Sequence, residues 1–435
     1  MNRSILKLAI PNIISNITIP LLGLVDMILM GHLTSPIYIG AIALGGTIFS
    51  VLYSFFSFLR AGTTGFTSQS YGANDSQEIS YSLYRSATIA FFAFLLILCI
   101  QNPIAKLSFT ILDGSVDVKN LAITYFFVRI WAAPANMMLY CLNGWFIGMQ
   151  NTKIPMAIAI IINVLNIVFS IFFVVVMKQD VVGVALGTVI AQYCGLISAL
   201  VFLFTKYKKY LIKVDIHILL NISKIKRFFK VNTDLMIRSI LLVFTIAFFT
   251  DQSAKFGDNI LSVNMILLQS FYIFSYFTDG FAYAGEALVG KFIGAKDSDK
   301  LRSVVMHLFK WGAAISVPFA ILYAIFPTTF VRMISDNPVI ISEIRPYYIY
   351  MTLIPIITFA AFLWDGIYIG ATASKAIRNT MIISSIIIFL PLWNFLTPAF
   401  GNHGLWIAFL GFMLARGISM TFSAKKNIIQ LINNQ

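Results

Sequence analysis

The sequence predicts an all-α integral membrane protein with twelve transmembrane helices in two pseudo-symmetric six-helix lobes. Of its 435 residues, 59% are hydrophobic and only 11% are charged, a balance that no water-soluble domain of this size carries. Apolar stretches of the roughly 20 residues that cross a bilayer recur along the whole chain. One constant shift, which carries Gly72 onto Gly294, relates its two halves.

Each apolar stretch is long enough to form one spanning helix. The first carries Pro11, Pro20 and Asp26 and lacks a small-residue cleavage pattern, so we expect it to remain as a helix rather than to be removed as a signal peptide. The predicted spans cover residues 8–31, 38–60, 84–103, 121–148, 155–177, 182–205, 232–255, 260–290, 303–327, 344–370, 377–399 and 403–423.

Two blocks of the chain align with later blocks at the same shift. Residues 72–76 (Gly-Ala-Asn-Asp-Ser) fall on residues 294–298 (Gly-Ala-Lys-Asp-Ser), and residues 144–148 fall on residues 366–370, which share their first and last glycines. Two matched blocks at one period indicate a duplicated unit, and an even number of spans in each copy makes the repeat parallel. Two such halves that rock around a central site are one plan of secondary transporters.

The repeat predicts an N-terminal lobe at 1–205 and a C-terminal lobe at 231–435, joined by a basic cytoplasmic linker at 206–230. A net charge of +14 would suggest a nucleic-acid partner in a soluble protein. Membrane orientation explains this charge instead, because with both termini in the cytoplasm 21 of the 31 Lys and Arg lie in or beside cytoplasmic segments. We therefore expect a multi-pass protein of the bacterial inner membrane, with anionic lipid attracted to the linker and no nucleic-acid partner.

Asp26 lies deep in the first span. A carboxylate at the centre of a membrane helix costs about 2.5 to 3.5 kcal/mol, so it needs a partner or a protonated state. Desolvation disfavours the charged form, which favours Asp26 as a proton carrier; a permanently hydrogen-bonded structural acid is the alternative. Pro11 and Pro20 remove two hydrogen bonds from the same helix, so they allow it to bend, although a static kink is an equally simple interpretation.

Other polar residues of the first half share helical faces with 3- and 4-residue spacing. They predict a substrate or ion pocket, although Asn and Ser in membrane helices often only bind helices together. The expected pocket residues are Asn143, Asn163, Asn166, Ser170, Thr188 and Gln192.

The second half carries the acids Asp279, Glu286 and Asp365, close to span ends or to glycines. This position allows contact with water, and we expect gating or structural roles rather than substrate contact. No Walker-type phosphate loop, no HExxH and only four scattered His occur in the sequence. These absences disfavour an enzyme, and they predict no cofactor and no dedicated metal site.

Several sequence blocks in a fixed order extend over nearly the whole chain. The first are Ala9-Ile10-Pro11-Asn12 and Pro20-Leu21-Leu22-Gly23-Leu24-Val25-Asp26. The later blocks are Thr64-Gly65, Tyr71-Gly72-Ala73, Leu165-Asn166-Ile167-Val168, 185–191, 279–284, Asp365-Gly366 and 369–372. Together these blocks resemble the multidrug and toxic compound extrusion (MATE) family, and in particular its DinF branch.

This resemblance implies a twelve-helix exporter of organic, often cationic and lipophilic, compounds in exchange for inward H⁺ or Na⁺. It assigns coupling to Asp26 and helix bending to Pro11, and it matches a polar cluster of relatives at Asp26, Asn166 and Thr188. Relatives carry a second carboxylate in this cluster, where the present chain has Ser170. Loss of that charge weakens a Na⁺ site at Asp26, Asn166 and Thr188, so H⁺ is the expected coupling ion.

Three alternatives remain open at this stage. A Na⁺-coupled exporter of the same family is the first. A flippase for lipid-linked precursors is the second; it would need arginines such as Arg60 and Arg129 to line the cavity. A non-transporting scaffold or receptor is the third. We expect the protein to act as a monomer on small organic substrates.

Overall fold

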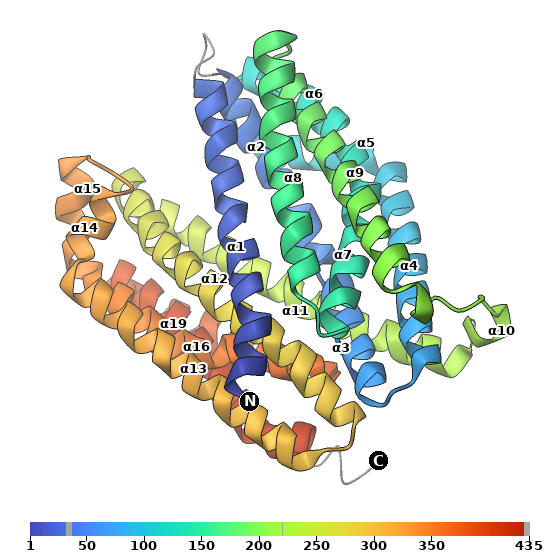
Figure 1. The fold of residues 1–435 in the computed structure, drawn as a ribbon. Coiled ribbons are helices and arrows are strands. Elements are labelled where there is room, and N and C mark those ends of the chain that lie inside the picture. The colour runs from blue at the N-terminus through green and yellow to red at the C-terminus, as the bar shows by residue number, and fades with distance from the viewer. Residues whose placement is uncertain (32–36, 220, 430–435) are drawn as a thin grey trace. The chain divides into compact units, whose positions relative to one another are not determined.

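The structure is a computed structural model that describes residues 1–31, 37–219 and 221–429, and the side chains of these residues except 19–31 and 429. Its described elements are all helical (Figure 1). Ten of the helices in this part of the chain are long and apolar enough to cross a membrane. The remaining two predicted spans correspond to the first helix and to a helix pair interrupted by one 3₁₀ turn.

The chain divides into two compact units, which are Ile14–Phe228 and Met1–Ile13 with Phe229–Gln435. The elements of the first half are α1 (Asn2–Gly31), α2 (Ile37–Phe56), α3 (Phe58–Gly72), α4 (Ser76–Cys99), α5 (Gln101–Ile111), α6 (Val116–Arg129), η1 (Ile130–Ala132), α7 (Ala133–Gly148), α8 (Lys153–Ile171), the π-helix η2 (Phe172–Val176), α9 (Val181–Lys206), η3 (Lys208–Tyr210) and α10 (Ile216–Leu219).

The elements of the second half follow a similar order. They are α11 (Ile222–Ala254), α12 (Asp258–Gly294), α13 (Ser298–Ile325), α14 (Pro327–Arg332), α15 (Pro338–Glu343), η4 (Arg345–Tyr347), α16 (Tyr348–Gly370), α17 (Ser374–Ile382), the π-helix η5 (Ile383–Phe389), α18 (Leu390–Phe400), α19 (Asn402–Ala424) and the π-helix η6 (Lys425–Ile429).

The two halves share backbone features at the predicted period. Asn74 and Lys296 both have positive φ, at 55° and 54°, and both precede an Asp that caps the next helix. Helix crossings repeat as well. A side chain at Gly144 would collide with the carbonyl of Arg60, and one at its repeat equivalent Gly366 would collide with the carbonyl of Ala282, the repeat equivalent of Arg60. The internal repeat is therefore a repeat of backbone geometry as well as of sequence.

The first helix is divided between the units. Residues 1–13 group with the C-terminal unit, whereas the sequence placed them in an N-terminal lobe of 1–205. The physical reason is a close contact between α1 and α12. Gly280 leaves room for the backbone of Ala9 and the side chain of Ile13, and Ile5 and Ala9 are fully buried.

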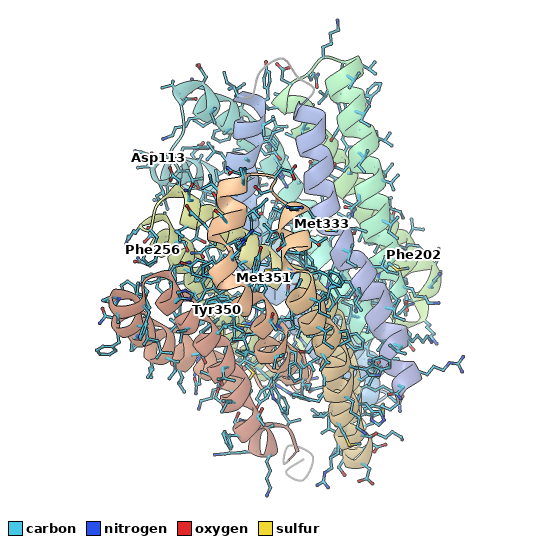
Figure 2. The ribbon with its side chains drawn as sticks, turned by 90° about the vertical axis from the view of Figure 1, so that its left-hand side faces the viewer. Asp113, Phe202, Phe256, Met333, Tyr350 and Met351 are labelled. Atoms are coloured by element: carbon cyan, nitrogen blue, oxygen red, sulfur yellow. The ribbon has the colours of Figure 1, made fainter. Side chains whose placement is uncertain are left out.

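Apolar side chains fill the interior of each unit and also cover much of its outside. Met351 is fully buried and Tyr350 is 5% exposed in the C-terminal core, whereas Met333 is 79% exposed (Figure 2). Exposed apolar side chains also line the long helices, for example Val168 and Phe422. Because no water-soluble surface would expose so many, this distribution fits helices that face lipid.

Candidate functional site

Helices α8 and α9 pack closely along a seam of small residues. Gly183 and Gly187 form a small-xxx-small pair on α9, a spacing that lets membrane helices approach closely. A side chain at Gly187 would lie 2.7 Å from the Ser170 hydroxyl and 2.8 Å from the Ser170 backbone nitrogen. This contact brings the predicted polar residues of the two helices to the same level.

The side chains of Asn166 and Thr188 meet across this seam. Asn166 Nδ2 donates to Thr188 Oγ1 at 2.9 Å, and the Thr188 hydroxyl donates to the Val184 carbonyl at 3.0 Å. Both residues are buried, with 1% and 6% exposure. The structure therefore brings together two of the predicted pocket residues, in an orientation that leaves the Asn166 carbonyl oxygen available.

Four of the predicted pocket residues hold buried oxygens without a hydrogen-bond partner in the described part of the chain. They are Asn143 Oδ1, Asn166 Oδ1, Ser170 Oγ and Gln192 Oε1. Buried polar atoms in proteins are nearly always paired, so a group of unpaired acceptors indicates a place for a proton, an ion, water or a polar ligand group. Without a carboxylate among them, this group is neutral.

Asn163 faces the first helix. Its amide Nδ2 donates to the Thr18 carbonyl at 3.3 Å, which links α8 to α1. Asp26 follows Thr18 by eight residues on the same helix, and its backbone is helical, but its side chain and that of Pro20 lie outside the described residues. The contacts of Asp26 therefore remain a prediction.

Pro11 lies inside a continuous helix. The described backbone of α1 is helical from Asn2 to Gly31, with no break at this proline. Pro11 is buried, and the neighbouring Asn12 donates its side-chain amide to the Leu8 carbonyl at 3.0 Å. Pro11 has no backbone N–H to donate within this turn, and the side chain of Asn12 adds a hydrogen bond there.

The C-terminal unit contains a buried ion cluster that the sequence did not predict. Asp365 on α16 accepts from Arg416 Nη2 on α19 at 2.5 Å, and Arg238 on α11 pairs with the same carboxylate oxygen. The exposed fractions of the three side chains are 7%, 1% and 21%. One signal could have found this site: the internal repeat places Asp365 on Asn143, a predicted pocket residue.

The expected water contact of the second-half acids is wrong for two of them. Glu286 is 1% exposed and Asp365 is 5% exposed. Asp279, on α12, is partly exposed and lies within electrostatic range of Arg416. The prediction failed because span ends were judged from hydropathy alone, whereas α12 and α16 are long helices that cross each other at these residues.

Arg129 has its partners within the N-terminal unit. It donates to the Tyr125 hydroxyl at 2.5 Å, and its guanidinium lies 4.9 Å from the centre of the Phe49 ring. Cation–π contacts of this kind hold a cation against an aromatic face. Arg129 therefore ties α6 to α2. Within the described residues, no group of three or more His, Cys, Asp or Glu could hold a metal ion.

Comparison with known families and structures agrees with this arrangement. The MatE family model matches residues 11–172 and 235–393. The chain belongs to this family. It is 33% identical over 419 residues to the DNA damage-inducible protein F of Escherichia coli, covering 96% of this chain and 91% of that protein. It is also 22% identical over 444 residues to the probable multidrug resistance protein NorM of Pasteurella multocida, covering 99% of this chain and 93% of the relative.

Solved MATE structures share the fold. One in the bent conformation superposes with a TM-score of 0.88 at 18% identity, over 100% of this chain and 96% of that one. Another structure, in the straight conformation, superposes with a TM-score of 0.89 at 18% identity, over 99% of this chain and 97% of that one. The predicted twelve-helix architecture and the predicted MATE membership are thereby confirmed.

Members of the MATE family are transporters, so this chain is a membrane-spanning multidrug exporter and not an enzyme. The scaffold or receptor interpretation is therefore not retained. The handling of small organic compounds follows from the same membership.

Proposed function

We propose that this MATE transporter exports lipophilic or cationic organic compounds in exchange for inward H⁺, with Asp26 as the proton carrier. The observation that carries the proposal is the neutral polar cluster of α8 and α9, with unpaired oxygens on Asn166 and Ser170, on a helix that Asn163 links to the helix that holds Asp26. Alternating access of the two halves would expose this cluster to each side of the membrane in turn.

Helix geometry supports this role for Asp26. Helices α1 and α8 run side by side in the same direction (Figure 1) and touch at Thr18 and Asn163. Eight residues along α1 advance about 12 Å to Asp26, and seven residues along α8 advance about 10 Å to Ser170. The backbone of Asp26 is thus expected at the level of Ser170.

The composition of the cluster favours H⁺ over Na⁺. A bound cation prefers several oxygen ligands that include negative charge. The described cluster offers amide and hydroxyl oxygens only, so a single acid on α1 would have to supply all the charge. Protonation of that acid needs no other ligand, and release of the proton would let it attract a cationic substrate.

Transport driven by imposed gradients tests the coupling ion. Proteoliposomes would contain the wild type, Asp26→Asn, Ser170→Asp or the control Asp251→Asn, which removes an exposed acid of α11 whose side chain is 64% accessible. We expect a pH gradient to drive efflux of a fluorescent organic cation by the wild type and the control. Asp26→Asn should abolish it, and Ser170→Asp, which supplies a second carboxylate, should add a response to Na⁺.

Two results would overturn this proposal. Equal efflux by Asp26→Asn and the wild type would remove Asp26 from coupling. A strict Na⁺ requirement in the wild type would favour the alternative Na⁺-coupled exporter, with ligands at Asp26, Asn166 and Thr188. The flippase alternative is less favoured, because Arg129, Arg238 and Arg416 are engaged with side chains of their own unit.

The same proposal includes the setting of the protein. We place it in the bacterial inner membrane as a monomer, with both termini and the linker in the cytoplasm, because the Lys and Arg of the chain gather on that side. Protease access to a tag at either terminus, from each side of sealed vesicles, tests the orientation.

A further inference from the structure

The linker after α9 is folded onto the N-terminal unit. Three residues of α4 hold its backbone: Ser80 bonds the Tyr210 carbonyl, the Tyr84 hydroxyl donates to the Ile212 carbonyl at 2.7 Å, and the Tyr81 hydroxyl accepts from the Asp215 N–H at 2.9 Å. Because three nearby residues are bound along one helix, the linker has a fixed course between Tyr210 and Asp215.

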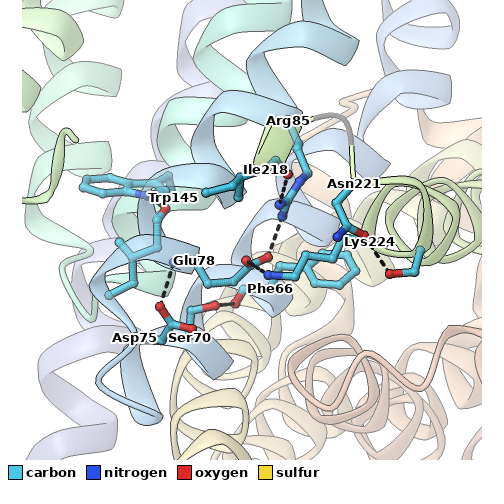
Figure 3. A network of polar contacts seen from close by, with 11 residues as sticks. Phe66, Ser70, Asp75, Glu78, Arg85, Trp145, Ile218, Asn221 and Lys224 are labelled. Carbon is cyan, nitrogen blue, oxygen red and sulfur yellow. Dashed lines mark hydrogen bonds and ion pairs between the residues drawn. The ribbon is translucent and has the colours of Figure 1, made fainter. Parts of the chain in front are cut away.

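An ion network fixes the end of this segment (Figure 3). Glu78 accepts from Arg85 at 2.5 Å and from Lys224 at 2.6 Å, and Arg85 also donates to the Ile218 carbonyl at 3.4 Å. The Arg85 side chain is only 6% exposed. Lys224 therefore ties the end of the linker to α4 through a carboxylate that it shares with Arg85.

The outer face of the linker is both basic and apolar. Lys208, Lys209 and Lys213 are exposed, and their neighbours Val214, Ile216 and Ile222 are 49%, 54% and 69% exposed. We call these six residues the linker surface. Asp215 is the only acid between residues 206 and 228, and one of its carboxylate oxygens accepts from the His217 N–H at 2.9 Å.

The linker surface lies where a membrane would end. The apolar span of α9 runs from Val181 to Lys206 and stops directly before it. Tyrosines surround this point, and Tyr207 packs 5.2 Å from the ring of Trp145. Tyrosines gather at the boundary between lipid and water, so the exposed lysines are placed at the level of lipid headgroups.

We propose that the linker surface binds the headgroups of anionic phospholipids in the adjacent leaflet. The exposed lysines would contact the phosphates, and the exposed apolar side chains would enter the boundary with the acyl chains, as in other basic interfacial segments. Because hydrogen bonds to α4 already fix the backbone, little ordering entropy opposes binding. This proposal is independent of the coupling ion and of Asp26.

Binding of defined lipids to the purified full-length protein tests the proposal. Native mass spectrometry would compare phosphatidylglycerol with phosphatidylcholine for the wild type and for the double variant Lys208→Gln/Lys213→Gln. The control Lys106→Gln/Lys178→Gln removes two exposed lysines of the same unit; Lys178 lies three residues before α9, at the end of this helix opposite the linker, and α9 is about 39 Å long. Thermal melting verifies that each variant is folded.

We expect the wild type to prefer phosphatidylglycerol, and the linker double variant to lose about tenfold or more of that preference, since each lysine near an anionic surface contributes about fivefold. The control double variant should keep the preference for phosphatidylglycerol, and added salt should weaken this preference in the wild type. An unchanged preference in the linker variant, or an equal loss in both double variants, would overturn the proposal.

Discussion

The two halves place different chemistry at the same point of one backbone repeat. Asn143 and Asp365 occupy equivalent positions of the repeat, and each holds a buried oxygen without a partner in the described residues. The unpaired oxygen of Asn143 belongs to a neutral amide, whereas Asp365 is a carboxylate that pairs with Arg238 and Arg416. A shared fold therefore does not impose a shared function on its equivalent positions.

The two sites differ in charge and in the helices that they join. Arg238 and Arg416 pair with one carboxylate oxygen of Asp365, and these ion pairs connect α11, α16 and α19. The neutral cluster beside α1 has no such partner charge in its described part.

The largest effect should come from breaking the ion cluster. Replacing Arg416 by Ala leaves a buried carboxylate with one remaining partner, and loss of one member of a buried pair costs about 3–5 kcal/mol of unfolding free energy. The control Lys255→Ala removes an exposed partner of Asp251 and should cost less than about 1 kcal/mol. Thermal melting in detergent measures both variants, and equal effects would show that the buried ion cluster stabilises the protein no more than an exposed ion pair does.

A smaller loss should follow from crowding the seam of the N-terminal cluster. The new methyl group of Gly187→Ala would lie 2.7 Å from the Ser170 hydroxyl, and overpacking of this kind costs about 1–3 kcal/mol. In Gly46→Ala the nearest atom is Arg129 Nη1 at 4.0 Å, so that variant should melt like the wild type. Transport by Gly187→Ala should also fall, because Thr188 follows directly on α9. If Gly187→Ala melted and transported like the wild type, the seam would not be tightly packed.

Replacing the unpaired amide itself should barely change stability. Asn143→Leu removes an unsatisfied acceptor, so its unfolding free energy should stay within about 1 kcal/mol of the wild type. The equivalent Asp365→Leu leaves Arg416 without its carboxylate, so it should lower the unfolding free energy several times more. Melting and efflux are measured together. A reduced efflux with unchanged melting would place Asn143 in the transport pathway, and a melting loss as large as that of Asp365→Leu would contradict the contrast.

The smallest effect concerns the repeated helix caps outside the membrane. Asp297 accepts from the Lys300 N–H at 3.0 Å and pairs with the Lys300 ammonium at 2.7 Å, and these bonds hold the pKa of its carboxyl below the ordinary value. A lowered folded-state pKa gives stability that is fully present above the ordinary pKa and lost as pH falls through the lowered one. At neutral pH the melting temperature of Asp297→Ala should therefore be slightly lower than that of the wild type. This difference should disappear in strong acid. A difference that persists there would rule out the ionised cap as its cause.

Sequence patterns predicted the helical features that depend on neighbouring residues. Hydropathy located the spans, and 3- and 4-residue spacing placed Asn163, Asn166 and Ser170 on one face of α8. The same spacing did not predict which amide would pair with α9 and which with α1; Asn166 bonds Thr188, whereas Asn163 bonds the Thr18 carbonyl. Partner choice depends on the rotation of each helix against its neighbours, which one segment does not encode by itself.

The sequence by itself determined the membrane class, the twelve-helix repeat and the position of the N-terminal polar face, because these follow from composition and from periodicity within single segments. Only the tertiary structure decided that Asp365 joins Arg238 and Arg416, that residues 1–13 pack with α12, and that the linker is bound to α4. These contacts join residues far apart in the chain. Their formation depends on which helices become neighbours, and local hydropathy carries no record of that choice.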